Sequence, residues 1–411
     1  MAKGVAEDID RPLTWAESGQ SILKLNIRHL WLCGVWPLPG CWLYDAYAIM
    51  GLIVGAVNAV ESAVSLYFYW GDMEETTLLL TSSVSNGCGT VKMAVFMRNH
   101  RQYFAMARRV EMMMSMQNEY TSEDPALDEI QQVAHKRGYR LTLFWTLLMF
   151  SQYFVWYPMP FYAHPGERRL PFAQHAWDNN TNQYALSYFL QCAASARGTQ
   201  LSWSLDLLFV SVMLLVAAQL EILTRRITSL KEESHEGKAA AVGEKSGKGM
   251  AANIYDNMYE NLRLCIETHQ KLLSFIRYLD DTMSSVVMIQ FCVSVLLVCV
   301  ALFQATYSTD STAVLRCALY LPMPGSQVFL YCWAAHSVTE QAEAVSLAAY
   351  SCSWVGTARR IKQSLRIIIS RAQKPLVMTA GHIYPIDREA FVSLVNASYS
   401  YYALLGQMSK R

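Results

Sequence analysis

The sequence predicts an all-α, polytopic membrane protein with seven transmembrane helices. Of its 411 residues, 53% are hydrophobic and only 16% are charged, whereas a soluble domain usually carries about 25% charged residues. The apolar residues also fall in long blocks, separated by loops that hold most of the charge. A block of roughly 20 apolar residues is what a helix needs to cross the hydrocarbon core of a bilayer. The distribution of Lys and Arg along the chain then predicts how these helices are oriented.

Seven segments are predicted to span the membrane, at residues 46–69, 76–97, 141–162, 200–222, 284–307, 313–336 and 385–408. The second is unusually rich in hydroxyl and amide side chains, so we expect it to face other protein or a cavity rather than lipid. The fourth segment can begin earlier, near Tyr188, because the residues before it are small and mostly uncharged. Residues 1–20 are polar and lack the apolar core of a signal peptide. The first helix is therefore expected to insert as an internal anchor.

Basic residues concentrate in alternate connecting segments. The N-terminal segment and the loops after spans 2, 4 and 6 hold 26 of the 34 Lys and Arg residues. The intervening loops are nearly empty of them: residues 70–75 have none, and residues 163–187 have only Arg168 and Arg169. Because Lys and Arg are enriched in cytoplasmic loops, we predict a cytoplasmic N-terminus and, after seven crossings, an extracellular C-terminus. This orientation is opposite to that of a G-protein-coupled receptor.

Two stretches beside the predicted spans have apolar residues at helical spacing. They include Met258, Leu262, Cys265, Ile266, His269, Leu272, Leu273 and Ile276 in the first, and Ile361, Leu365, Ile368, Ile369 and Ala372 in the second. We expect amphipathic helices that continue spans 5 and 7 into the cytoplasm. Their apolar faces require other helices as partners or, in the alternative, lie on the membrane surface. Residues 234–252 are small and polar and are expected to be flexible.

These patterns divide the chain into three regions. Residues 1–337 would hold transmembrane helices 1 to 6 with their cytoplasmic loops. Residues 338–384, together with 254–283, would form a cytoplasmic helical region. Residues 385–411 would form transmembrane helix 7.

Several functional classes are excluded by what the sequence lacks. A net charge of +1, with no concentration of basic residues on a candidate groove, argues against a nucleic-acid partner. The ten cysteines include no CxxC pair, and no GxSxG, HExxH or clustered His, Asp or Glu occurs within a span. We therefore expect no enzyme activity, no metal and no other cofactor.

Two acidic residues, Glu61 and Asp206, lie well inside predicted spans rather than at their ends, and an ionisable group at that depth is a functional candidate. Asp206 is expected either to pair with Arg197 or to line a wet cavity.

The C-terminal region is the most informative part of the sequence. The motif residues that carry its resemblance are Cys332, Ala348, Ala349, Tyr350, Trp354, Arg371, Ala372, Gln373, Pro375, Leu376, Thr379, Ala380, Gly381, Phe391, Ser398, Tyr399, Ser400 and Tyr401. In order and spacing, this run resembles the C-terminal region of insect odorant receptors. It covers about a fifth of the chain. Ser400 and Tyr401, followed by Gln407 and Met408, also resemble the signature of the related gustatory receptors.

The resemblance implies a subunit of a tetrameric, odorant-gated, non-selective cation channel in the plasma membrane of the olfactory neuron dendrite. Its partners would be the odorant receptor co-receptor, a small neutral volatile, permeant cations and membrane lipid. The chain lacks the long loop of the co-receptor itself, so it resembles an odorant-specific tuning subunit. A gustatory-receptor-like ligand-gated channel is the main alternative. A G-protein-coupled receptor is a further one, although the chain lacks the Asp-Arg-Tyr and Asn-Pro-x-x-Tyr motifs of that class.

Site residues follow from the resemblance and the predicted topology. By motif position, Leu404 resembles the hydrophobic gate of the family and Gln407 its polar ring, with Tyr401 on the same pore-lining helix. The family binds odorants in the outer half of the membrane between spans 2, 3, 4 and 6. The residues expected there are Met73, Thr77, Leu80, Val84, Phe150, Tyr153, Trp156, Tyr157, Ser195, Thr199, Leu319 and Met323. They predict an apolar, aromatic-lined cavity with a few hydroxyls and no charge. Asn179 begins an Asn-Asn-Thr sequon in a loop predicted to be extracellular, and is expected to carry a glycan.

Overall fold

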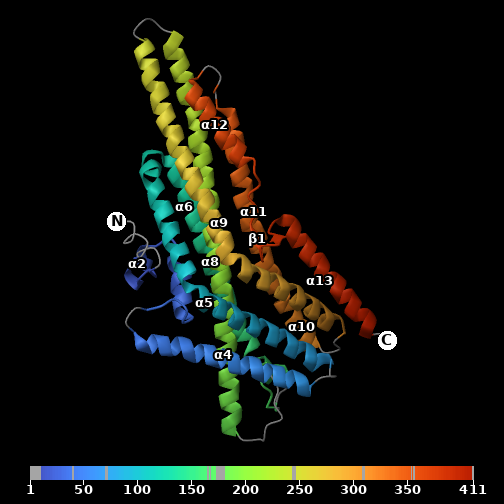
Figure 1. Ribbon diagram of the computed structural model, residues 1–411. Coiled ribbons are helices and arrows are strands. Elements are labelled where there is room, and N and C mark those ends of the chain that lie inside the picture. The colour runs from blue at the N-terminus through green and yellow to red at the C-terminus, as the bar shows by residue number, and fades with distance from the viewer. Residues whose placement is uncertain are drawn as a thin grey trace.

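The computed structural model describes residues 11–38, 41–69, 73–163, 166, 168–172, 181–242, 247–307, 311–352, 354 and 357–409. The described chain is built almost entirely of helices (Figure 1). They are α2 (Trp15–Gln20), α3 (Lys24–Leu32), α4 (Trp42–Phe68), α5 (Met73–Glu123), α6 (Pro125–Trp156), α7 (Met159–Ala163), α8 (Thr181–Val242), α9 (Gly247–Tyr307), α10 (Ser311–Tyr320), α11 (Pro322–Ser351), α12 (Arg359–Ala372) and α13 (Arg388–Ser409). A short hairpin, β1 (Thr379–Ala380) and β2 (Tyr384–Pro385), lies between α12 and α13. The all-α prediction is confirmed.

Helix α8 is the centre of the fold, and α11, α9 and α6 pack most extensively against it. Its most apolar stretch is 89% buried within the protein. By contrast, the corresponding stretch of α4 is only 17% buried, with Val57, Val60 and Tyr67 exposed. Such an exposed apolar face on a peripheral helix fits contact with lipid.

Within the described residues, three helical segments are long and apolar enough to cross a membrane by length and composition alone. They are Trp42–Phe68, Gln183–Leu230 and Asp256–Tyr307. The second predicted span, in α5, does not reach that threshold because hydroxyl and amide side chains interrupt it. A helix of this kind can lie at membrane depth when protein rather than lipid surrounds it.

The predicted cytoplasmic loops after spans 2 and 4 are largely long helices. Helix α5 continues well beyond span 2, with a kink at Asn99 (φ −110°, ψ 18°), two residues after the predicted end of that span. The next helix, α6, begins at a strong cap: Asp124 accepts a hydrogen bond from the Ala126 amide at 2.9 Å, and Pro125 occupies the first helical position. Helices α8 and α9 form a similar hairpin (Figure 1). Backbone helix continues to Val242 and resumes at Gly247, so most of residues 234–252 is helical rather than an open linker.

The first predicted amphipathic stretch is the N-terminal half of α9 and runs directly into span 5, as expected. Its apolar residues Met258, Leu262 and Leu272 are fully buried. The second forms α12, which packs against α11 and α9 through Ile361, Leu365, Ile368 and Ala372. Packing against other helices, rather than a membrane surface, therefore accounts for both apolar faces. The expected continuity with span 7 is wrong, because the β-hairpin separates α12 from α13.

The hairpin is fastened to α9 just before span 5. Asp280 accepts hydrogen bonds from the Thr379 amide at 2.6 Å and from the Thr379 hydroxyl at 3.0 Å. Ser284 donates to the Thr379 carbonyl at 2.8 Å and accepts from the His382 amide at 2.8 Å. Gly381 and His382 adopt positive φ values of 62° and 57°, which a tight turn requires. These bonds fix the start of α13 relative to α9.

The predicted span 313–336 is interrupted. Helix α10 ends at Tyr320 and α11 begins at Pro322, because proline has no backbone N–H to continue the helical bonding pattern. The break between α10 and α11 changes the direction of the chain beside a cavity that both helices line.

Candidate functional site

A cavity of about 140 Å³ lies among α5, α6, α8, α9, α10 and α11. Its walls are largely apolar and aromatic, with side chains from each of these helices and Phe172 from the segment before α8. An apolar cavity of about 150 Å³ accommodates a molecule the size of benzene. The cavity can therefore hold a small organic molecule of about one ring.

Aromatic residues of α6 form one wall. Tyr153 and Tyr157 stack with ring centroids 5.1 Å apart, and Trp156 meets Tyr320 of α10 edge to face at 6.1 Å. The polar ends of both tyrosines are held by α8. Tyr153 hydrogen-bonds the Thr199 hydroxyl at 2.8 Å, and Tyr157 donates to the Cys192 carbonyl at 2.9 Å. The rings are thus fixed with their apolar bodies toward the cavity, as suits contact with an aromatic ligand.

One face of α9 forms another wall. Gln290, Val293, Leu297, Ala301 and Gln304 all line the cavity. Their spacing of three or four residues places them on a single side of the helix. This wall was not predicted from the sequence, although two glutamines in an otherwise strongly apolar span are a detectable signal.

A buried ion pair adjoins the cavity, because its hydrogen-bond partners Ser202, Gln290 and Gln327 also line it. Lys92 of α5 is fully buried, and its Nζ lies 2.7 Å from Oδ1 of Asp206 on α8. The ammonium also donates to the Ser202 hydroxyl at 2.9 Å and to Oε1 of Gln290 at 2.6 Å. Three N–H donors therefore meet three partners.

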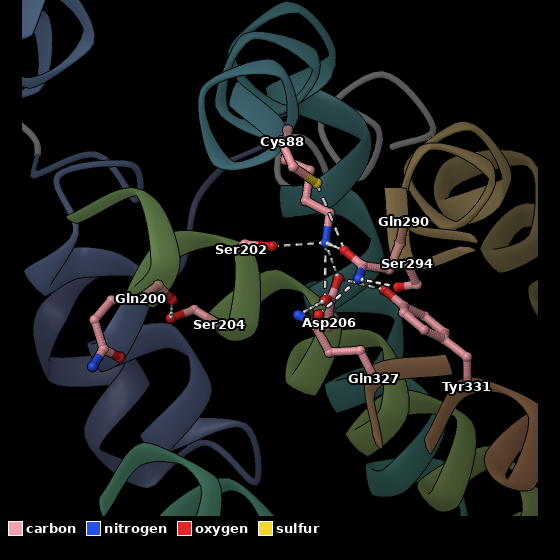
Figure 2. Close-up of polar contacts among 10 residues, drawn as sticks. Cys88, Gln200, Ser202, Ser204, Asp206, Gln290, Ser294, Gln327 and Tyr331 are labelled. Carbon is pink, nitrogen blue, oxygen red and sulfur yellow. Dashed lines mark hydrogen bonds and ion pairs between the residues drawn. The ribbon is translucent and has the colours of Figure 1, made fainter. Parts of the chain in front are cut away.

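The carboxylate of Asp206 is equally well satisfied. It accepts hydrogen bonds from Nε2 of Gln327 at 2.9 Å and from the Tyr331 hydroxyl at 2.8 Å, both on α11. Figure 2 shows Gln327 and Tyr331 of α11 meeting Asp206, with Gln290 of α9 beside Gln327. Gln290 in turn donates to Gln327 at 2.7 Å and to Ser294 at 2.9 Å. The network around the ion pair thus joins α5, α8, α9 and α11, and its two glutamines, Gln290 and Gln327, line the cavity.

This arrangement corrects the expected pairing of Asp206 with Arg197. Arg197 instead donates to the carbonyls of Cys33 at 3.0 Å and Ala48 at 3.2 Å. Arg197 and Asp206 are nine residues apart on one helix, which at 100° per residue places them on opposite faces, about 13 Å apart along the axis. Lys92 was missed, although a lysine inside a predicted span is itself a signal. The other predicted acid, Glu61, accepts a bond from Gln191 at 3.4 Å.

Seven of the twelve residues expected in the odorant site line the cavity: Tyr153, Trp156, Tyr157, Ser195, Thr199, Leu319 and Met323. On α5, however, the lining residues are Thr81, Ser82, Ser85, Asn86 and Cys88. The expected residues Thr77, Leu80 and Val84 lie about one position away around that helix, a rotation of about 100°. The side chain of Met73 lies outside the described residues. Phe150 contacts Tyr153 edge to face at 6.0 Å but is 42% exposed and is not part of the cavity lining.

The expectation that the cavity carries no charge is wrong. Arg316 of α10 is one of its lining residues. The predicted glycosylation residue, Asn179, lies outside the described residues.

The expected gate residues lie on an open face of α13. Tyr401 is 57% exposed, Leu404 is 53% exposed, and Gln407 is also exposed. Behind them, the C-terminal end of α9 contacts α13: the Tyr307 hydroxyl donates to the Gly406 carbonyl at 3.3 Å, and Thr306 and Tyr402 lie 3.2 Å apart through their hydroxyls. Helix α9 therefore contacts α13 near its end and, through the hairpin, at its start.

Comparison with known proteins agrees with this geometry. A family model described as 7tm Odorant receptor matches residues 72–399. The chain is 26% identical to Odorant receptor 10 of Aedes albopictus over 374 residues, covering 88% of this chain and 92% of that relative. It is 25% identical to Odorant receptor Or2 of Anopheles gambiae over 377 residues, covering 89% and 95% of the two chains.

Solved structures show the same fold. The structure of the olfactory receptor OR5 of the insect Machilis hrabei, in complex with eugenol, superposes with a TM-score of 0.72 at 18% identity. The superposition covers 94% of this chain and 97% of that one. The family model spans most of the chain and includes every helix that lines the cavity, together with most of α13. This transmembrane receptor therefore belongs to the insect odorant receptor family.

Proposed function

We propose that this chain is the odorant-binding subunit of a ligand-gated, non-selective cation channel in the plasma membrane. In this proposal it assembles with the odorant receptor co-receptor as a tetramer, with its N-terminus in the cytoplasm and its C-terminus outside. The cavity among α5, α6, α8, α9, α10 and α11 takes a small volatile molecule. The helix α13 lines the pore together with the equivalent helices of the other subunits.

The observation that carries this proposal is the position of α9 between cavity and pore helix. One face of α9 lines the cavity from Gln290 to Gln304. The same helix holds the start of α13 through Asp280 and Ser284, and contacts its far end through Tyr307. A ligand that displaces α9 would therefore displace α13 as well. Such a transfer requires only that the ligand bind the open arrangement more tightly than the closed one.

The open face of α13 supports the proposed pore. Leu404 is apolar and half-exposed, and Gln407 follows at one helical turn. A ring of apolar side chains can close a pore by excluding water, and a nearby polar ring can hold a hydrated ion. In a single subunit both would be exposed, because the other subunits complete each ring.

Ligand chemistry follows from the cavity. The lining is mainly apolar and aromatic, so burial at about 25 cal/mol per Å² supplies most of the binding free energy. A small neutral volatile of about one aromatic ring is the class that fits. The related OR5 of Machilis hrabei was solved with eugenol, a molecule of that class.

The test is electrical recording from cells that express this chain with the co-receptor. We expect odorant-evoked cation currents within milliseconds, persisting when G proteins are blocked, and little current from the chain alone. Currents that vanish with G-protein block would favour a G-protein-coupled receptor. Full odorant-evoked current without the co-receptor would contradict the pairing and favour a self-sufficient, gustatory-like channel.

The proposed orientation has its own test. Tags on the N-terminus and in residues 234–252 should be shielded from antibody in intact cells, whereas a C-terminal tag should be accessible. An accessible N-terminal tag would contradict the topology.

A further inference from the structure

Gln304 differs from the other cavity glutamines described above. Gln290 and Gln327 use their amide groups within the network around Lys92 and Asp206. Gln304 lies at the other end of the α9 face, only three residues before the helix ends at Tyr307. Its side chain is 6% exposed and lines the cavity.

The Gln304 amide is only half satisfied. Its Oε1 accepts a hydrogen bond from the Cys317 thiol at 3.3 Å, while its Nε2 is buried without a hydrogen-bond partner among the residues that the structure describes. Leaving a buried donor unpaired costs about 1–3 kcal/mol, so such groups are rare in folded proteins. An unpaired donor beside a binding cavity is a group that a ligand can satisfy.

A second hydrogen-bond donor, Arg316, also lines the cavity. Arg316 precedes Cys317 on α10, and a guanidinium group only donates hydrogen bonds. The cavity lining therefore includes the Gln304 amide N–H and a guanidinium group. Both favour a ligand with an oxygen or nitrogen lone pair over a ligand that can only donate a hydrogen bond.

We infer that Gln304 is a specificity-determining residue, whose Nε2 donates a hydrogen bond to an acceptor atom of the odorant. This inference rests on the proposed odorant-binding role of the cavity. The ligand class it selects is a small ketone, aldehyde, ester or ether, with its apolar body against Tyr153 and Trp156. The terminal torsion of glutamine is soft, so the amide can turn toward such an atom while the helix remains in place.

The physical consequence is discrimination between molecules of equal shape. A site built to hydrogen-bond a substrate group discriminates against the analogue that lacks it, because its own donor is then left unpaired. The appropriate probes are pairs in which a methylene replaces the carbonyl oxygen. Acetophenone with α-methylstyrene and 2-heptanone with 2-methyl-1-heptene are two such pairs.

The test compares the wild-type complex with Gln304→Met, which keeps the length of the side chain and removes its polar atoms. Binding is measured as ligand-induced thermal stabilisation of the purified complex with the co-receptor, which does not depend on gating. Odorant-evoked current supplies a second readout. Leu296→Met, on the 42% exposed face of the same helix, is the matched control.

We expect the wild type to bind the carbonyl member of each pair more tightly, and Gln304→Met to reduce that preference about three- to tenfold. Binding of the hydrocarbon by the variant shows that it has folded. Leu296→Met should keep the wild-type preference. An unchanged preference in Gln304→Met, or an equal loss of both ligands, would overturn the role of Gln304 while leaving the odorant-binding role intact. Failure of the wild type to bind any member of a broad panel of such pairs would instead overturn the proposed function.

Discussion

The ammonium nitrogen of Lys92 lies 2.7 Å from Oδ1 of Asp206, although the two residues are 114 positions apart in the sequence. Both side chains are almost completely buried. Removing one partner would leave an uncompensated charge in a low-dielectric interior, which costs about 3–5 kcal/mol. Replacing both residues with apolar ones leaves no buried charge.

We therefore predict that Lys92→Met and Asp206→Leu each abolish surface expression, and that the double variant recovers part of it. Surface labelling and thermal stability of the purified complex measure the effect. Arg360→Met serves as the control, because Arg360 and Asp256 form an exposed pair, which is worth about 0–1 kcal/mol. A double variant no better than the worse single variant would show that the two charges are not coupled.

Helices α5 and α8 come into close backbone contact at two glycines. A Cβ atom on Gly89 would lie 2.3 Å from the carbonyl oxygen of Gly198, which belongs to the backbone and cannot rotate away. We predict that Gly89→Ala forces the helices apart, with a loss of several degrees in melting temperature and reduced odorant response.

Gly87 provides the control for that change. It lies on the same helix, but a Cβ there would meet nothing within 4 Å. Because alanine is favoured over glycine in a helix by roughly 1 kcal/mol, Gly87→Ala should be neutral or slightly stabilising. Equal effects of the two variants would show that the helix crossing is not the cause.

A buried histidine in the N-terminal half of α9 predicts that the stability of the protein depends on pH. His269 is 3% exposed, and burial, with a smaller contribution from the Arg371 charge, lowers its pKa from 6.5 to about 4. In the unfolded chain His269 is protonated as the pH falls below about 6.5, whereas in the folded chain it stays neutral until about pH 4. The contribution of neutral His269 to the free energy of unfolding is therefore fully present above pH 6.5 and is lost as the pH falls from 6.5 to 4.

We expect His269→Leu to flatten the decline in melting temperature of the purified complex between pH 7 and pH 5. His135 is exposed, so His135→Leu should leave that slope as in the wild type. The same steep decline in His269→Leu as in the wild type would assign the pH dependence to other groups.

The sequence located the α6 wall of the cavity but not the α5 wall, for a physical reason. On α6, Tyr153, Trp156 and Tyr157 stand out at helical spacing among smaller residues, so one face is recognisable. In the second span, hydroxyl and amide residues surround the helix on every side, from Thr76 to Asn86. Such a pattern identifies a helix that faces protein but does not define its rotation.

The sequence also did not predict which residues pair across the helix bundle. Periodicity describes which face of a helix is apolar, but it contains no information about which residue lies opposite across the bundle. Lys92, Asp206, Gln290 and Gln327 are each visible as polar residues inside predicted spans. Their convergence depends on how α5, α8, α9 and α11 pack, which only the folded chain shows.

The aromatic wall of the cavity gives a direct test of the binding site. Trp156 lines the cavity, while Phe154 on the same helix is 82% exposed and points away from it. We predict that Trp156→Ala shifts the odorant dose response at least tenfold to higher concentration, because it removes a large apolar contact. Phe154→Ala should leave the response unchanged at equal surface expression. A larger shift in Phe154→Ala than in Trp156→Ala would place the odorant elsewhere.

The last prediction concerns the proposed gate on α13. Leu404 and Leu405 are adjacent and differ in exposure, at 53% and 38% respectively. They lie about 100° apart around the helix, so only one of the two side chains can point toward the pore axis. If Leu404 forms the apolar ring, a serine at that position would let water and ions remain in the closed pore.

We therefore expect Leu404→Ser to raise the current recorded without odorant from cells that also express the co-receptor, while Leu405→Ser does not. The increase should be partial, because the other subunits still contribute apolar side chains to the ring. Gln407→Leu should instead change the relative permeability to Na⁺, K⁺ and Ca²⁺, since it removes a polar contact for a hydrated ion. Basal current that rises with Leu405→Ser but not with Leu404→Ser would mean that α13 is rotated in the assembled channel. Unchanged leak, conductance and permeability in Leu404→Ser, Leu405→Ser and Gln407→Leu alike would remove α13 of this subunit from the pore.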